Sequence, residues 1–92
     1  MNVQIVKRGG QRGHETFSRD KLHRSIVAAC LSVRSSEGGA KTAANAVCMA
    51  MEKWLGERPE VTSDDLRRVA TRTLKIHNPE AAYYYSQHKH IV

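Results

Sequence analysis

Apolar side chains recur every three or four residues along most of the chain, which is the spacing that places them on one face of an α-helix. The clearest stretch carries Leu22 and Ile26 behind Ser18, a residue type favoured at helix N-caps. The last stretch follows Asn78 and Pro79, which supply a cap and a proline for the first helical position. The pattern predicts four helices. The first covers about residues 19–33 and the second about residues 40–55. The third is capped by Thr62 or Ser63 and lies before Asn78, and the fourth covers about residues 79–89.

The start of the chain alternates apolar and polar residues instead, as β-strands do. Residues 2–7 read NVQIVK and residues 14–17 read HETF, with three glycines between them. Glycine tolerates the positive φ that a tight reversal requires, so we expect a β-hairpin here. Because an isolated hairpin is only marginally stable, this one must pack on the helices.

These elements predict an α+β fold that is mostly α, with an N-terminal β-hairpin packed on a four-helix bundle. Residues 56–61, GERPEV, are predicted to form a loop because Gly56 and Pro59 both resist helix continuation. No repeat or low-complexity linker interrupts the pattern. We therefore expect residues 1–92 to form a single domain.

The composition restricts the class of protein. Of the 92 residues, 40% are hydrophobic and only 5% aromatic, so Ala, Val, Leu and Ile must build the core. There is no apolar run of about 18 residues and no signal-peptide pattern, so we expect a cytoplasmic protein without a membrane partner. Cys30 and Cys48 form no CxxC pair and lie in apolar stretches. Buried reduced thiols are the expectation, with a disulfide as the alternative that a cytoplasmic location disfavours.

The formal net charge of +6 indicates anionic partners such as phosphates, nucleic acid or an acidic protein surface. Lys7 and Arg8 end the first predicted strand, and Lys21 lies one turn into the first predicted helix. If the hairpin folds back on that helix, these cations converge near a helix N-terminus, whose N–H groups already favour phosphate. A solvated basic face is the alternative that the charge pattern alone leaves open.

Patterns for catalysis and for metal binding are missing from the sequence. There is no P-loop motif and no evident nucleophile–base pair. His88 and His90 form an H-x-H pair, which supplies too few ligands for a convincing metal site. We expect no enzyme activity, no catalytic residue and no metal ligand.

The stretch VKRGGQRGHETFSRDKLHRSI, residues 6–26, resembles the opening of the ATP cone domain, which begins with a pattern close to V-x-K-R-(D/N)-G followed by (E)-x-F-(D/N)-x-x-K. The later VTSDDLRRVATRTL is similar to that family's third helix, and NPEAAYYY is similar to its closing segment. The resemblance covers nearly the whole chain, as for an isolated or standalone cone. ATP cones regulate ribonucleotide reductases and occur in a bacterial repressor of reductase genes.

The resemblance implies a regulatory module that binds ATP or dATP, with Mg²⁺, as an allosteric ligand rather than reacting with it. Its expected partners are a second copy of the chain or an effector protein such as a ribonucleotide reductase subunit. Carried over position by position, the family's nucleotide-binding residues fall on Val6, Lys7, Arg8, Glu15, Ser18, Lys21, Ser63 and Arg67. Among these, Lys7, Arg8 and Lys21 match basic positions that meet the nucleotide.

Two departures from the family pattern bear on binding. Gly9 stands where the family has Asp or Asn, in a longer hairpin tip, and Ser18 replaces an Asp or Asn before the first helix. Two alternatives to nucleotide binding therefore stay open. One is a small basic nucleic-acid-binding protein that uses the N-terminus and the third helix, and the other is a protein-interaction module that no longer binds nucleotide.

Overall fold

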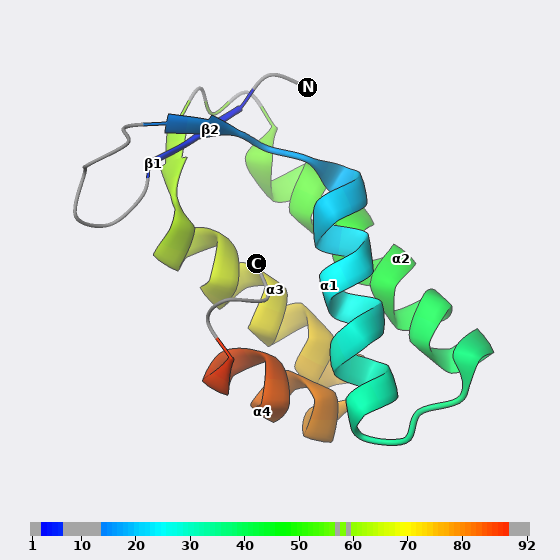
Figure 1. Cartoon of the computed structure of the whole chain (residues 1–92). Helices are drawn as coiled ribbons and strands as arrows, with labels where there is room; N and C mark the ends of the chain where they lie inside the picture. Colours follow the sequence, from blue (N-terminus) through cyan, green and yellow to red (C-terminus); the bar gives the residue numbers. More distant parts are fainter. Residues whose placement is uncertain (1–2, 7–13, 57, 59, 89–92) are drawn as a thin grey trace.

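The computed structural model of the chain describes residues 3–6, 14–56, 58 and 60–88, with backbone only at Val6, His14 and Glu15. The helices form a bundle with the short strands at one end of it (Figure 1). In chain order the elements are β1 (Gln4–Val6), β2 (His14–Thr16), α1 (Arg19–Ser32), α2 (Glu37–Leu55), β3 (Glu60–Thr62), α3 (Ser63–His77) and α4 (Pro79–Gln87). The predicted α+β class, mostly α, is confirmed.

The strands form one sheet in the order β2-β1-β3. β1 pairs with β2 in antiparallel register, with Ile5 opposite Glu15, so the predicted hairpin pairing is confirmed. β1 also pairs with β3, in parallel, with Val6 opposite Thr62. The sheet therefore joins the start of the chain to the residues that lead into α3.

The prediction of a loop over residues 56–61 was wrong at its end, because β3 starts at Glu60. Val61 is buried between exposed neighbours, as in a strand with one face on the core. Three residues are too few for this alternation to stand out in the sequence. The partner strand that stabilises it comes from the other end of the chain, which no local pattern reveals.

Each helix starts at a capping side chain whose oxygen accepts a backbone N–H in the first turn. Ser18, Thr62 and Asn78 cap α1, α3 and α4 as expected. Ser36 caps α2 by accepting from the Gly39 N–H at 3.0 Å. The helix therefore begins at Glu37, three residues before the predicted start, and takes in the two glycines that had indicated a turn.

The core is built from small and aliphatic residues of all four helices and of the sheet. Ile26, Met51, Leu74 and Tyr85 are among its largest fully buried side chains. Cys30 and Cys48 are buried there as free thiols, which confirms the prediction of reduced cysteines. Burial raises the pKa of both thiols, which keeps them protonated at neutral pH.

Asn78 connects three parts of the fold. Its Oδ1 accepts the Ala81 N–H at 3.0 Å, its Nδ2 donates to Ser35 Oγ at 3.3 Å, and its own N–H closes α3 on the Leu74 carbonyl. Since Ser35 follows α1, one side chain fixes the start of α4 against the end of α1.

Replacing Asn78 with alanine is expected to cost about 1–2 kcal/mol of unfolding free energy, because both a cap and a tertiary hydrogen bond are lost. The matched control is Ser36→Ala, which removes a cap that has no tertiary contact and is expected to cost about 0.5–1 kcal/mol. Urea unfolding followed by circular dichroism measures both. Equal losses for the two variants would show that the bond to Ser35 adds no stability.

Candidate functional site

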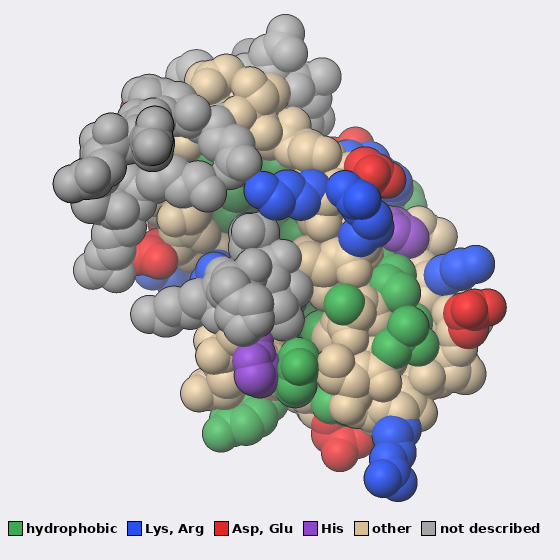
Figure 2. Space-filling view, in the orientation of Figure 1, with side chains coloured by type: hydrophobic (Ala, Val, Ile, Leu, Met, Phe, Trp, Pro, Cys, Tyr) green, Lys and Arg blue, Asp and Glu red, His purple; other side chains and the backbone are tan. Residues whose placement is uncertain are grey.

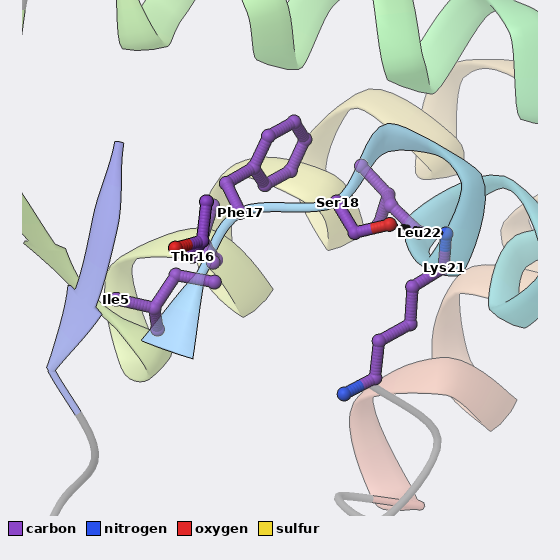
Figure 3. A pocket seen from close by; sticks show the side chains of 7 residues that line it. Ile5, Thr16, Phe17, Ser18, Lys21 and Leu22 are labelled. Carbon is purple, nitrogen blue, oxygen red and sulfur yellow. Dashed lines mark hydrogen bonds between the residues drawn. The ribbon is translucent and has the colours of Figure 1, made fainter. Parts of the chain in front are cut away.

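A pocket lies where the sheet meets the first turns of two helices. Its lining comes from β1, from the end of β2 and the link to α1, from α1 and from α3 (Figure 3). The lining residues are Ile5, Thr16, Phe17, Ser18, Lys21, Leu22 and Leu66.

The floor of this pocket is apolar. Ile5, Phe17, Leu22 and Leu66 are each at most 9% exposed, because they also belong to the core. The pocket is small, about 30 Å³, and partly open to solvent. A larger ligand would therefore lie on this floor, with its polar groups at the rim, rather than inside the cavity.

The rim carries Ser18 and Lys21 at the start of α1. The Ser18 Oγ accepts the Lys21 N–H at 3.2 Å, which fixes the first turn of the helix. The Lys21 side chain is exposed and extends from this turn along the pocket toward the end of α4 (Figure 3). Lys and Arg side chains gather beside acidic ones on this face of the molecule, over the start of α1 (Figure 2).

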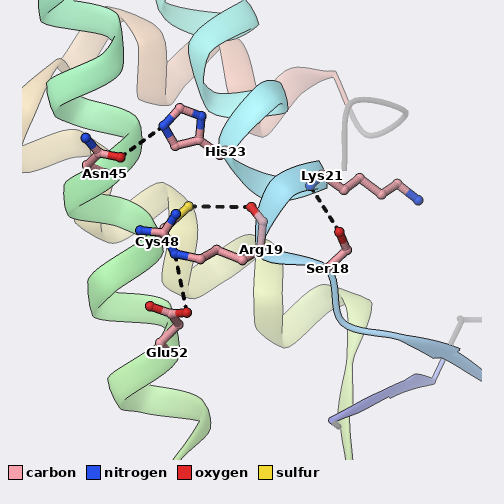
Figure 4. A network of polar contacts seen from close by, with 7 residues as sticks. All are labelled: Ser18, Arg19, Lys21, His23, Asn45, Cys48 and Glu52. Carbon is pink, nitrogen blue, oxygen red and sulfur yellow. Dashed lines mark hydrogen bonds and ion pairs between the residues drawn. The ribbon is translucent and has the colours of Figure 1, made fainter. Parts of the chain in front are cut away.

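The opposite side of the α1 start is held by α2 (Figure 4). Arg19 Nε lies 3.3 Å from Glu52 Oε2. The backbone carbonyl of Arg19 accepts a hydrogen bond from the Cys48 thiol at 3.8 Å. His23 Nε2 lies 3.0 Å from Asn45 Oδ1. These contacts orient the helix so that Lys21 points away from α2 and toward the pocket.

The parallel pairing places the start of α3 at the other end of the strands from the start of α1, which follows Thr16 opposite Gln4. Val6 and Thr62 are register partners, so the chain enters α3 at Ser63 beside the point where β1 ends. Thr62 Oγ1 caps α3 by accepting the Asp65 N–H at 3.0 Å. The first turns of α1 and α3 thus approach the pocket from opposite ends of β1, α1 through Lys21 and Leu22 and α3 through Leu66.

The structure brings together only some of the residues that the sequence singled out. Ser18 and Lys21 line the pocket, while Ser63 does not but begins α3, the helix whose Leu66 lines it. Arg67 lines a separate hollow between α3 and α4, with its guanidinium carbon 5.8 Å from the centre of the Tyr85 ring. Val6 and Glu15 are placed by backbone only, and Lys7 and Arg8 lie outside the described residues.

Sequence reasoning did not single out the apolar floor or Thr16. Ile5 and Leu22 were recognised as strand and helix positions, but their periodicity indicates burial and does not distinguish a core residue from one that also lines a pocket. A usable signal is that Phe17 and Leu22 flank the polar pair Ser18 and Lys21. A polar pair between two buried residues marks the place where a helix start borders the core.

No group of three or more His, Cys, Asp or Glu side chains within the described residues is arranged to hold a metal ion. None of their helices is both long enough and apolar enough to cross a membrane.

Comparison with known families agrees with the fold. The family model of the ATP cone domain matches residues 3–91. The chain therefore belongs to the ATP cone family. Members of this family are regulatory nucleotide-binding modules that bind ATP or dATP as allosteric effectors, so the resemblance seen in the sequence is confirmed. A search of curated proteins found no match to the chain.

Proposed function

We propose that this chain binds ATP or dATP over the pocket formed by β1, the β2–α1 link and the start of α3. The observation that carries the proposal is the position of Lys21, an exposed cation on the rim of an apolar floor, at the first turn of α1. The floor suits the face of a purine base, and the rim suits phosphate. This is the chemistry that a member of the ATP cone family requires.

In this arrangement Lys21 binds a phosphate oxygen, and Lys7 and Arg8, which follow β1 in the sequence, add further positive charge. Ser63 and Glu15 contact the base and the sugar, and Val6 contributes through its place in β1. Arg67, the remaining position that the family pattern assigns to the ligand, lines the hollow between α3 and α4 rather than this pocket. Mg²⁺ accompanies the phosphates and needs few protein ligands of its own.

The bound nucleotide regulates rather than reacts. Binding alters the oligomeric state of the chain or its contact with an effector in the cytoplasm, such as a ribonucleotide reductase subunit or a regulator of reductase genes. Such an effect requires that the nucleotide bind two states of the protein with different affinity. The sheet and the two helix starts that it joins are the parts of the site that a nucleotide would hold together.

Isothermal titration with ATP and dATP in the presence of Mg²⁺ tests the proposal. We expect saturable binding by the wild-type chain and none by the double variant Lys7→Ala/Arg8→Ala, whose helical circular dichroism spectrum should be unchanged. Gel filtration with and without nucleotide then reports any change of oligomeric state. An unchanged affinity in the double variant would place the nucleotide elsewhere.

A further inference from the structure

A second hollow, of about 500 Å³, lies between α3 and α4 and is separate from the pocket on the sheet side. The two helices run side by side in opposite directions, so the end of α4 lies beside the first half of α3 (Figure 1). Four cations line the hollow, and the only acid among its lining residues is Asp64. These cations are Arg67, Arg68, Arg72 and Lys75.

Three of these cations form a line along α3. Arg68, Arg72 and Lys75 are spaced four and three residues apart, so they share one helix face, and all are exposed. At a rise of about 1.5 Å per residue they cover about 10 Å along the helix axis. They are therefore spread too far apart to converge on one small anion.

Asp65 pairs with one cation of the line, Arg68, at the exposed surface. Arg68 Nη1 lies 3.6 Å from Asp65 Oδ1, and these side chains are 71% and 41% exposed. Ion pairs this exposed contribute little stability, so an incoming anion can replace the carboxylate at low cost. Ser86, on the α4 side of the hollow, donates its hydroxyl to the Tyr83 carbonyl at 2.8 Å, so the cations supply the donors for an anion.

The spacing of these three cations along α3 suits an extended chain of phosphates better than a single phosphate. Nucleic acid carries a regular row of phosphates along each strand, so a line of cations about 10 Å long can face more than one phosphate. Single strands are usually held by aromatic side chains that stack on the bases. Among the described residues none that lines this hollow is aromatic, which favours the backbone of a duplex over a single strand.

We propose that the α3–α4 hollow binds the phosphate backbone of duplex nucleic acid, without base contacts, as a second site beside the nucleotide pocket. The cations at Arg72 and Lys75 neutralise phosphates, and Arg68 exchanges its partner Asp65 for a third phosphate. Because the contact is to the backbone, it is independent of base sequence and strongly dependent on salt.

The test uses fluorescence anisotropy with a labelled 20-base-pair DNA duplex of arbitrary sequence and the complete chain. The variant Arg72→Ala/Lys75→Ala is compared with Lys41→Ala/Lys53→Ala, which removes the same charge from exposed positions on α2. We expect the α3 variant to lose at least about tenfold in duplex affinity and about two units of the salt slope. The α2 control should change by less than about threefold, since exposed cations outside the site add only general attraction.

Three results would overturn the proposal: no saturable duplex binding at low salt, equal losses in the two variants, or tighter binding of the single strand than of the duplex. Titration with ATP separates this proposal from that of the nucleotide pocket. Arg72→Ala/Lys75→Ala is expected to leave ATP affinity unchanged, whereas Lys7→Ala/Arg8→Ala removes it. Each site can therefore fail without the other.

Discussion

Replacing Lys21 with alanine is expected to weaken the binding of ATP and dATP by about 10- to 100-fold without unfolding the chain. A hydrogen bond to a charged group contributes about 1.5–3 kcal/mol, and each 1.4 kcal/mol is a factor of ten in affinity. Lys21 is exposed, and its backbone N–H donates to Ser18 Oγ, a bond that alanine retains. The substitution should therefore weaken nucleotide binding without lowering the stability of the fold. Isothermal titration measures the change in affinity.

The matched control is Lys41→Ala, which removes an exposed lysine from α2. Its nucleotide affinity should match that of the wild type, and the unfolding free energy of both variants should stay within about 0.5 kcal/mol of it. Lys21→Arg retains the charge and should keep part of the affinity. If Lys21→Ala and Lys41→Ala bound nucleotide equally well, the phosphates would not lie at the start of α1.

The largest effect on stability is expected at Tyr85. Its side chain is fully buried at the junction of α3 and α4, with the Arg67 guanidinium on one side of the ring. Tyr85→Ala should lower the unfolding free energy by about 3–5 kcal/mol, since the ring is lost and the space cannot close. In a chain of this size each kcal/mol corresponds to about 4–8 °C, so thermal melting should shift by well over ten degrees.

Tyr85→Phe separates the ring from its hydroxyl. The Tyr85 hydroxyl is buried and has no hydrogen-bond partner among the described residues. Its removal should therefore change stability by less than about 1 kcal/mol, or raise it. A loss as large as that of Tyr85→Ala would mean that the hydroxyl, and not the ring, stabilises the junction.

Comparison of the wild type with Tyr85→Phe also tests how the unfolding free energy depends on pH. Burial raises the pKa of Tyr85 above its ordinary range, against a smaller lowering by Arg67. Its contribution to stability is then complete below the unfolded pKa of about 10 and is lost as the pH rises above it, because only the unfolded chain ionises readily. Tyr85→Phe should lose less stability than the wild type between pH 9 and about 11.

Much of the fold was predictable from the sequence because its signals are local. Ser18, Thr62 and Asn78 mark helix starts through bonds to residues three positions away, and alternation marks the hairpin. β3 was not predictable, since Val61 is a strand residue only because Ile5 lies beside it. The glycines at the start of α2 were misleading because Ser36 stabilises the helix despite their poor helix propensity.

For the site, the cations and the cap were accessible to sequence reasoning, whereas the cavity was not. Ser18 and Lys21 stand out by residue type and by their place before and within a predicted helix. The lining by Leu66 depends on how α3 packs against α1 and the sheet, and the position of Arg67 depends on α4. Such positions follow from tertiary packing, which a single sequence does not state.

The parallel pairing of β1 with β3 also sets an order in which the structure can form. It joins residues 4–6 to residues 60–62, so the chain must close a loop that contains both α1 and α2 before these bonds exist. Contacts of this range form late and open early relative to those within helices. The pairing of β1 with β3, which borders the proposed nucleotide site, is thus the last part of the sheet to form. A nucleotide that contacts both β1 and the start of α3 would stabilise this pairing against local opening.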